Sequence, residues 1–241
     1  MAFDIGRFTE MTLGSKTFRA LTNACIEFFT GEGVEMMSYH HLPPPGANDY
    51  NAQITIATHG FPGAWVREYI NNRYYKIDPI PRAAVLATRP FWWAEAYRFK
   101  GVPAQGRDFL DKLKDAKLGE GLAVPVFGPS GRNGYCGIGF GQVKPRLTES
   151  DLSALQWSCQ LGHMRYCELL REEAPDGMSL SRRETEILKW VARGKSNSVI
   201  AEIVGISVHT VDTHLRRIYM KLQVTDRVTA ALRGLAIGAV A

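Results

Sequence analysis

The sequence predicts an α+β protein in two parts, with strands and helices mixed over residues 1–171 and helices alone over residues 179–241. Apolar residues follow only the helical period in the second part, whereas helical and alternating patterns both occur in the first. Residues 178–241 hold 10 Lys and Arg against 5 Asp and Glu, while the rest of the chain holds 19 of each. Between the parts, residues 172–178 (EEAPDGM) have the charge, proline and glycine of an exposed linker.

The first part begins with helical spacing over residues 6–31, which predicts one or two helices. Residues 34–39 predict a strand, residues 41–49 (HLPPPGAND) a loop, and residues 53–58 (QITIAT) a second strand. We expect His40 and His41, at the end of the first strand, to lie at the surface.

An aromatic segment follows over residues 61–97. Trp65 and Tyr69 are four positions apart and share one helix face. Asp78 precedes Pro79, where a helix ends or restarts. Composition alone favours an ordinary aromatic core whose polar atoms bond to the backbone, but a ligand pocket is built from the same types of residue.

The remainder of the first part predicts a helix over residues 105–117, strands over 121–127 and 135–143, and a turn at 128–134. In the second of these strands Gly137, Gly139 and Gly141 share one bare face, which a helix or a ligand can approach closely. Their spacing is not that of a dinucleotide-binding loop. A long helix begins at Thr148 and carries two apolar stripes, so we expect it to pack against a partner subunit.

Composition also limits the class of protein. The four cysteines form no CxxC pair and indicate reduced, buried thiols. Cys159, His163 and Cys167 share one helix face, but the outer thiols lie about 12 Å apart along the axis, too far for one metal ion. No apolar run approaches the roughly 20 residues that span a bilayer, and the first twenty residues lack a secretory apolar core. We expect a cytoplasmic protein without metal, cofactor or membrane contact.

The second part predicts four short helices, over residues 181–193, from Ser196 or Asn197 to Gly205, over 208–222, and over about 226–237. Ser181 and Glu184 have the spacing of a capping box, and Gly194 ends the first helix. Four residues of the last helix are expected to close the small core: Val228, Ala231, Leu232 and Leu235.

The third of these helices has an inner apolar face and an outer polar and basic one. Such a helix in a closely spaced set is typical of a helix-turn-helix that binds DNA. The outer face presents His209, Asp212, Thr213 and Arg216, with Arg217 and Lys221 beside it to reach phosphates. The remaining candidate DNA contacts are Lys195, Ser196, Ser207 and Thr210.

At these residues the chain resembles the DNA-binding domain of LuxR-type regulators. The matching positions are Leu180, Ser181, Arg183, Glu184, Glu186, Leu188, Trp190, Gly194, Lys195, Ser196, Asn197, Ile200, Ala201, Ile203, Ile206, Ser207, Thr210, Val211, His214, Lys221, Leu222 and Arg227. Asp212 stands where many relatives have a basic or amide residue. An acid there can accept from cytosine N4 but repels phosphate.

The first part is similar to the acyl-homoserine-lactone-binding domain of quorum-sensing receptors, in the spacing of Trp65, Tyr69, Asp78, Pro79, Trp93 and Gly121. The resemblance implies an α-β-α sandwich around an antiparallel sheet, with the signal between sheet and helices. It further implies that Trp65 donates to the lactone carbonyl and that Asp78 accepts from the amide N–H. Tyr69 would line the acyl channel, and Trp93 would pack against the ring.

Two positions depart from the family pattern. Phe61 stands where many members have a tyrosine that donates to the amide carbonyl, and Gly137 falls where a serine or threonine often meets the signal. We therefore expect a roomier, less polar pocket that takes a long, unsubstituted or aromatic acyl group.

Together these features predict a homodimeric transcriptional activator of quorum-sensing type, with residues 1–171 for sensing and dimerisation and residues 179–241 for binding a two-fold symmetric operator on double-stranded DNA. A regulator that is ligand-independent, or that senses a non-lactone ligand, is the main alternative. A DNA-tethered lactone-processing enzyme is a further one. The chain has no GxSxG, no catalytic Cys–His signature and no paired carboxylates at a motif spacing, so no catalytic residue is expected.

Overall fold

A computed structural model describes residues 3–47, 56–173 and 179–240. The chain forms two compact units, whose main parts are an α/β domain that ends at Glu172 and a helical domain after it. The predicted linker falls almost entirely on residues 174–178, which lie outside the described residues.

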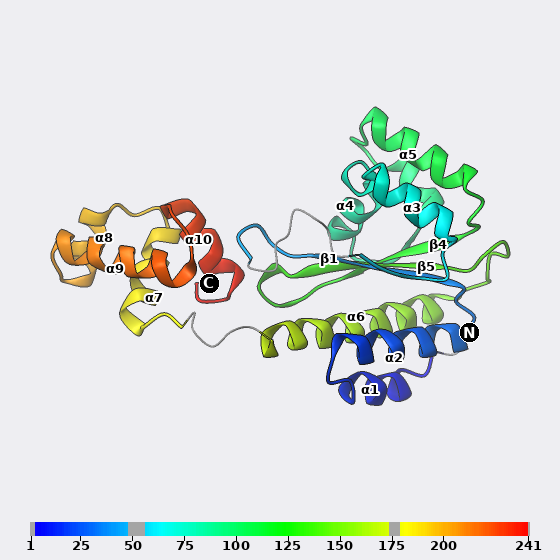
Figure 1. The fold of residues 1–241 in the computed structure, drawn as a ribbon, viewed down its shortest axis with the longest axis horizontal. Helices are drawn as coiled ribbons and strands as arrows, with labels where there is room; N and C mark the ends of the chain where they lie inside the picture. The colour runs from blue at the N-terminus through cyan, green and yellow to red at the C-terminus, as the bar shows by residue number, and fades with distance from the viewer. Residues whose placement is uncertain (1–2, 48–55, 174–178, 241) are drawn as a thin grey trace. The chain divides into compact units, whose positions relative to one another are not determined.

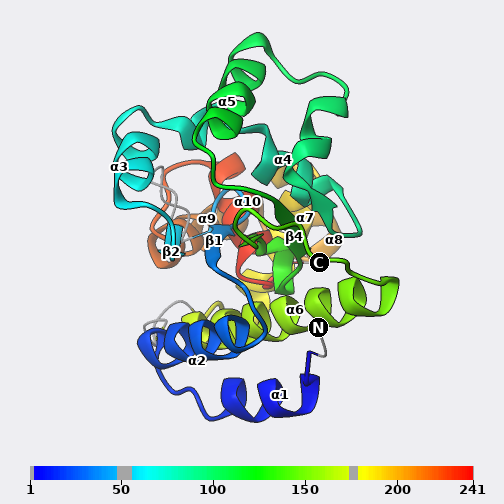
Figure 2. The ribbon, with the colours of Figure 1, turned by 90° about the vertical axis from the view of Figure 1, so that its right-hand side faces the viewer.

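The α/β domain is built on one antiparallel sheet with the strand order β2-β1-β5-β4-β3. The strands are β1 (Met36–Leu42), β2 (Ile56–His59), β3 (Phe91–Trp92), β4 (Gly121–Val126) and β5 (Asn133–Gly139). Helices α3 (Gly63–Asn71), α4 (Pro79–Leu86) and α5 (Ala104–Asp115) cover one face, and α1 (Ile5–Leu13), α2 (Phe18–Gly31) and α6 (Glu149–Glu172) cover the other (Figures 1 and 2). The α-β-α sandwich implied by the family resemblance is therefore confirmed.

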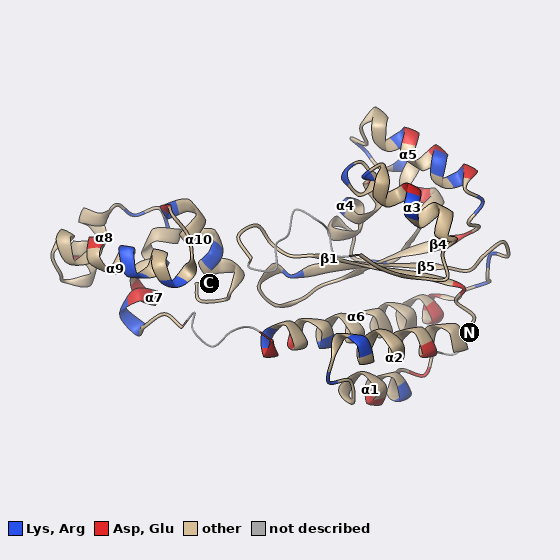
Figure 3. Cartoon of the chain, in the orientation of Figure 1, with Lys and Arg blue, Asp and Glu red and all other residues tan. Residues whose placement is uncertain are grey.

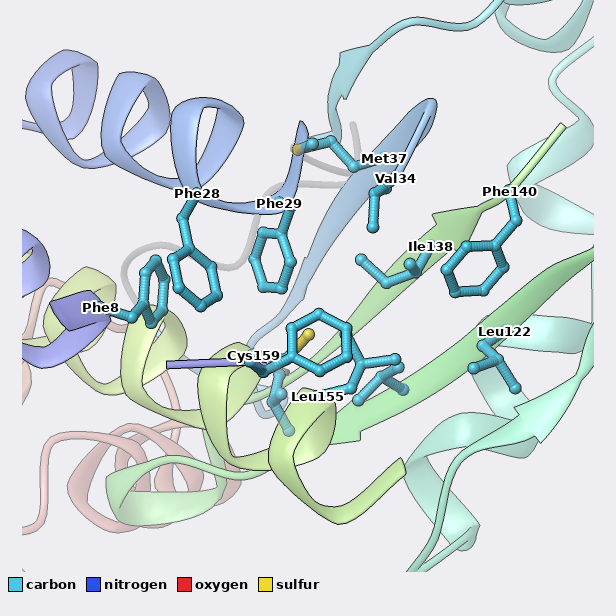
Figure 4. Close-up of a cluster of buried hydrophobic side chains, with 13 residues drawn as sticks. Phe8, Phe28, Phe29, Val34, Met37, Leu122, Ile138, Phe140, Leu155 and Cys159 are labelled. Carbon is cyan, nitrogen blue, oxygen red and sulfur yellow. The ribbon is translucent and has the colours of Figure 1, made fainter. Parts of the chain in front are cut away.

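The main core of this domain lies between the sheet and the layer of α1, α2 and α6 (Figure 4). Phe8, Phe28 and Phe29 pack in tilted and edge-on pairs with ring centroids 4.4–5.5 Å apart. They meet Ile138 of β5 and Leu155 of α6, which are buried. Ile138 of β5 therefore faces this layer, and Gly137 and Gly139 lie on the opposite face.

The position of β1 corrects one expectation from the sequence. The strand continues to Leu42, and β2 and β5 pair with it on both sides. Because β1 is an internal strand, His40 and His41 are buried, with only 4% and 3% of their surfaces exposed. The prediction that both lie at the surface was wrong.

The long helix α6 begins as the sequence predicts. The Thr148 hydroxyl accepts from the Asp151 amide at 3.1 Å, and the Asp151 carboxylate accepts from the Thr148 amide at 2.8 Å. Leu155 and Cys159 face the core, whereas Trp157 is 62% exposed and Met164 is also exposed. One of the two predicted apolar stripes is thus left largely uncovered by the chain itself.

The helical domain consists of α7 (Arg182–Ala192), α8 (Asn197–Val204), α9 (Val208–Leu222) and α10 (Arg227–Ala236). Each begins at a side-chain cap: Ser181, Ser196, Ser207 and Asp226 accept from the amide two or three residues into the helix. Ile187, Leu188, Ile200, Val211 and Ile218 form a separate buried core. The four predicted helices are confirmed within one or two residues.

The inward face of α10 differs from the prediction. Val228, Leu232 and Leu235 are exposed, whereas Ala230, Gly234 and Ala236 are buried. A Cβ at Gly234 would lie 2.7 Å from Leu188 Cδ2, so α10 approaches α7 at a glycine. Small residues rather than large ones therefore mark the packed side of this helix.

Within the described ranges, no helix combines the length and apolar character needed to cross a membrane. None of the four cysteines forms a disulfide there, and in the same residues no cluster of three His, Cys, Asp or Glu side chains could hold a metal ion. Cys167 Sγ contacts His163 Nε2 at 3.6 Å, while Cys159 packs into the core.

An ion pair between the buried Glu184 and the partly exposed Lys221 joins α7 to α9. The Glu184 carboxylate accepts from Lys221 Nζ at 2.7 Å and from the Ser181 amide at 2.7 Å, which completes the predicted capping box. Burial acts to raise the pKa of Glu184, but hydrogen bonds from Lys221 and Ser181 outweigh it and lower the pKa overall. This carboxylate therefore stabilises the fold above its unfolded pKa, and that contribution is lost as the pH falls.

We expect Glu184→Ala to lower the free energy of unfolding of the helical domain by about 1–3 kcal/mol, because it removes both the cap and the ion pair. Urea denaturation followed by circular dichroism measures this. Glu186→Ala is the matched control, since Glu186 makes an exposed 2.8 Å pair with Arg183 on the same helix and should cost less than about 1 kcal/mol. Equal losses for the two variants would contradict the assignment.

Candidate ligand pocket and nucleic-acid interface

A cavity of about 90 Å³ lies between the sheet and helices α3, α4 and α5. Four residues predicted from the sequence line it: Phe61, Trp65, Tyr69 and Asp78. Trp93 also lines it, together with Ser38, His40, Ile56, Thr58, Val66, Ile70, Ile80, Phe109, Leu113 and Tyr135. The fold therefore brings five of the seven predicted ligand-binding residues to one cavity.

Asp78 is the only acidic residue among the described residues that line this cavity. It precedes Pro79, and its side chain caps α4 by accepting from the Ile80 amide at 2.8 Å. Its second oxygen accepts from the Tyr69 hydroxyl at 2.9 Å, which ties α3 to α4. Burial raises the pKa of Asp78 to about 7, against the lowering effect of these two hydrogen bonds.

This shift has a consequence for stability. The folded domain holds the Asp78 proton more tightly than the unfolded chain does, so the contribution of this group to stability falls as the pH rises from about 4 to about 7. A ligand that donates a hydrogen bond to the carboxylate would compensate for its burial.

An aromatic wall stands beside Asp78. Trp65 and Tyr69 project from the same face of α3, and their ring centroids lie 6.3 Å apart. Both also contact Tyr74 and Phe109, at 5.8–6.3 Å between centroids. These rings shape one side of the cavity, and Tyr69 is at the same time the donor that positions the carboxyl.

Gly121 does not line the cavity itself, but its lack of a side chain makes room for the Trp93 ring. A Cβ at Gly121 would lie 2.4–2.5 Å from the Trp93 ring, and one at Gly139 would lie 3.2 Å from it. The ring therefore lies directly on the bare face of β4 and β5. The Trp93 Nε1 is buried and makes no hydrogen bond within the described part of the chain.

Gly137 does not leave the empty space that the sequence suggested. A Cβ there would lie 2.5 Å from Ser38 Oγ and 2.7 Å from the Tyr135 hydroxyl oxygen. Two hydroxyls from β1 and β5 thus fill the volume that a side chain at Gly137 would take. The expected roomier, less polar pocket does not form at this position, although Phe61 does lack a donor.

His40 is a pocket residue that the sequence interpretation missed. Its ring lies 4.8 Å from that of Tyr135 and 6.5 Å from that of Tyr69. Burial lowers its pKa to about 3, so the imidazole is neutral, and Nδ1 makes no hydrogen bond within the described residues. Period-two alternation along β1 was the available signal, because it places His40 on the same face as Ser38.

In the helical domain, α8 and α9 form the helix-turn-helix, and basic residues outnumber acidic ones (Figure 3). His209, Arg216 and Arg217 are exposed along α9, and Thr213 is partly exposed. Lys195 is exposed before α8. Ser196 and Ser207 cap their helices, and the Ser207 hydroxyl also bonds to that of Thr210 at 2.8 Å.

Two predicted DNA contacts on α9, Asp212 and Lys221, bond to other helices of the domain. Asp212 accepts from Asn197 Nδ2 at 2.9 Å, and Asn197 in turn accepts from Arg227 at 2.9 Å, so this chain of bonds joins α8, α9 and α10. Lys221 pairs with the buried Glu184. This geometry favours a packing role for Lys221 over the phosphate contact predicted from the sequence.

Both domains match known families. Residues 17–166 match the autoinducer binding domain, and residues 178–233 match the domain of bacterial regulatory proteins of the luxR family. The chain belongs to the LuxR family of autoinducer-binding regulators. Members of this family are transcription regulators rather than enzymes, and this chain is accordingly a DNA-binding regulator with a sensing domain.

Curated relatives agree with this assignment. The transcriptional activator protein AnoR of Acinetobacter nosocomialis is 27% identical over 188 residues, which cover 76% of this chain and 78% of AnoR. The quorum sensing-dependent transcriptional regulator RpaR of Rhodopseudomonas palustris is 29% identical over 195 residues, which cover 80% of this chain and 78% of RpaR.

Solved structures share the fold. SdiA of Escherichia coli superposes with a TM-score of 0.76 at 19% identity, covering 98% of this LuxR-type chain and 97% of SdiA. A second SdiA structure, in complex with octanoyl-rac-glycerol, also has a TM-score of 0.76, at 18% identity, and covers 96% and 93% of the two chains.

We expect Gly121→Ala to destabilise the sensing domain by about 1–3 kcal/mol, because the new methyl group overlaps the Trp93 ring. Thermal or urea unfolding measures the change. Gly31→Ala makes the same substitution at a position with no heavy atom within 4 Å and should leave stability within about 0.5 kcal/mol or raise it. The assignment is wrong if Gly121→Ala is tolerated as well as this control.

Proposed function

We propose that the cavity beside Asp78 binds an N-acyl-homoserine lactone. The observation that carries this proposal is the Asp78 carboxyl, which faces the cavity and whose pKa is raised to about 7. Hydrogen bonds from the Tyr69 hydroxyl and the Ile80 amide hold it in position. Such a group accepts from a secondary amide N–H. In this proposal Trp65, on the same wall, donates to the lactone carbonyl, as the family resemblance implies.

The acyl group meets a mixed surface. Ile56, Val66, Ile70, Ile80 and Leu113 supply aliphatic contacts, and Phe61 and Phe109 supply aromatic ones. These contacts support an apolar acyl group, long and unsubstituted or aromatic. On the sheet side, the unpaired His40 Nδ1 favours a ligand that brings one neutral polar group to β1.

A neutral acyl glycerol is a second candidate ligand, since its hydroxyls are donors for the same carboxyl. SdiA with octanoyl-rac-glycerol makes this class worth including in any binding panel.

The regulator acts as a homodimer in this proposal. The exposed stripe of α6 that includes Trp157 and Met164 is the surface for a second copy of the chain. Ligand burial stabilises the sensing domain and thereby the dimer, which presents two α9 helices to the half-sites of a two-fold symmetric operator and activates transcription.

The binding proposal predicts a specific pH dependence. An amide N–H bonds more strongly to a carboxylate than to a carboxylic acid, so lactone affinity should rise as the pH increases from about 6 to about 8, through the pKa of Asp78. Asp78→Asn should bind about tenfold more weakly at pH 7.5 and lose this dependence. Calorimetry with freshly dissolved decanoyl-homoserine lactone measures both.

Asp108→Asn is the matched control, because Asp108 is exposed on α5 and should keep wild-type affinity and pH dependence. A panel with short 3-oxo lactones, aromatic acyl lactones and octanoyl glycerol tests the acyl preference. Preference for the short 3-oxo compounds would contradict the apolar acyl group, and absence of any lactone binding would overturn the proposed function.

The DNA-binding face yields a separate prediction. Arg216 is 79% exposed in its side chain and lies 3.7 Å from Asp212, so its guanidinium can leave that weak pair to contact DNA. Arg216→Ala should cost about 1–3 kcal/mol in operator binding, measured by fluorescence anisotropy. Lys189→Ala, an exposed basic residue on α7, is the control. If the two losses are the same, Arg216 does not read bases.

A further inference from the structure

A second cavity, of about 140 Å³, lies on the opposite face of the sheet, between β1, β2, β5 and helices α2 and α6. It shares only Ser38 and Thr58 with the cavity beside Asp78, and these two residues are paired in the sheet that separates the cavities. The two cavities are therefore distinct sites in one domain.

Small side chains create this space. Cys25 of α2, Cys136 of β5 and Cys159 of α6 line it, together with Gly162 of α6, where even a Cβ would lie at ordinary contact distance from Cys25 Sγ, 3.5 Å. Protein interiors contain few voids larger than a water molecule, and each void reduces stability in proportion to its volume. Larger side chains at these positions would close the cavity, so the small size of these residues keeps it open.

The lining selects an uncharged occupant. Among the described residues that form it there is no Lys, Arg, Asp or Glu. Burial raises the pKa of the Cys25 thiol to about 12 and that of Cys159 well above its usual value, so both thiols stay protonated at neutral pH. Low thiolate content also makes these cysteines poor nucleophiles and argues against a redox or covalent role.

Several polar groups of the lining already have partners. The Tyr39 hydroxyl bonds to His163 Nδ1 at 2.8 Å, Thr22 donates to the Phe18 carbonyl at 2.9 Å, and Ser158 donates to the Ala154 carbonyl at 3.0 Å. Phe29, Met37 and Ile138 supply apolar surface (Figure 4). This contrasts with the first cavity, where His40 and Trp93 have unpaired nitrogens.

We propose that this second cavity, defined by Cys25, Cys136, Cys159 and Gly162, is a binding site for a small, neutral, apolar molecule of the size of a substituted benzene. An apolar protein cavity of about 150 Å³ takes up benzene, which sets the scale of the occupant. Because the site contacts α2, α6 and the sheet together, its occupant strengthens the packing of this helical layer. The proposal is independent of the lactone site.

The test uses the full-length protein with ¹³C-labelled isoleucine methyl groups and toluene as the probe. Ile26 and Ile138 line the second cavity, whereas Ile70 and Ile80 line the first. We expect toluene to shift the methyl signals of Ile26 and Ile138 with saturation at millimolar or lower concentration, and to leave Ile70 and Ile80 in place. A lactone should move Ile70 and Ile80 instead, so failure of either site is seen separately.

Two variants fill the cavity from different sides. Cys136→Ile acts from β5, and Ala57→Leu acts from the edge strand β2, where a larger side chain disturbs the core less. Each should weaken toluene binding at least tenfold while preserving the lactone response. Non-saturating shifts, shifts confined to Ile70 and Ile80, or unchanged toluene binding in a folded filled variant would each overturn the proposal. The wild-type titration decides alone if neither variant folds.

Discussion

The hydrogen bonds of the Asp78 carboxyl are the constraint on which the sensing site depends. One oxygen caps α4 and the other accepts from Tyr69 of α3, so a single side chain sets the relative position of two helices and of the aromatic wall between them. The cost of burying this group appears as a pKa raised to about 7. A ligand amide can reduce that cost, which couples occupation of the pocket to the stability of the helical layer above it.

The sheet gives its two faces different chemistry through strict alternation. On β5, Gly137 and Gly139 allow Ser38, Tyr135 and Trp93 to approach the pocket side. Cys136 and Ile138, between them in sequence, face the layer of α2 and α6. The unpaired nitrogens of His40 and Trp93 thus lie on one face, and the thiol and apolar side chains of Cys136 and Ile138 on the other. One strand thereby supports two cavities that suit different ligands.

Local rules predicted the elements well, because caps and periods act within a few residues. Ser181 with Glu184 and Thr148 with Asp151 begin helices as expected. Errors arose where a neighbour distant in sequence decides the outcome. His40 is buried because β2 and β5 flank its strand, and the volume at Gly137 is filled from another strand. In α10, large residues point outward because Gly234 permits a close approach to α7.

For the site, family spacing identified Trp65, Tyr69, Asp78 and Trp93, but no pattern within the sequence indicated how Tyr69 and Asp78 bond to each other.

In the DNA-binding domain too, contacts between residues distant in sequence decide the outcome, here which charges remain available. Counting residues gives an excess of positive charge over residues 178–241, but part of it is used internally. Lys221 neutralises the buried Glu184, and Asp212 bonds to Asn197, which also holds Arg227. These bonds hold α7, α8 and α10 around α9, so they determine how the recognition helix is presented. We therefore expect affinity for phosphates and bases to depend on the charges that remain exposed on α9, above all those of Arg216 and Arg217.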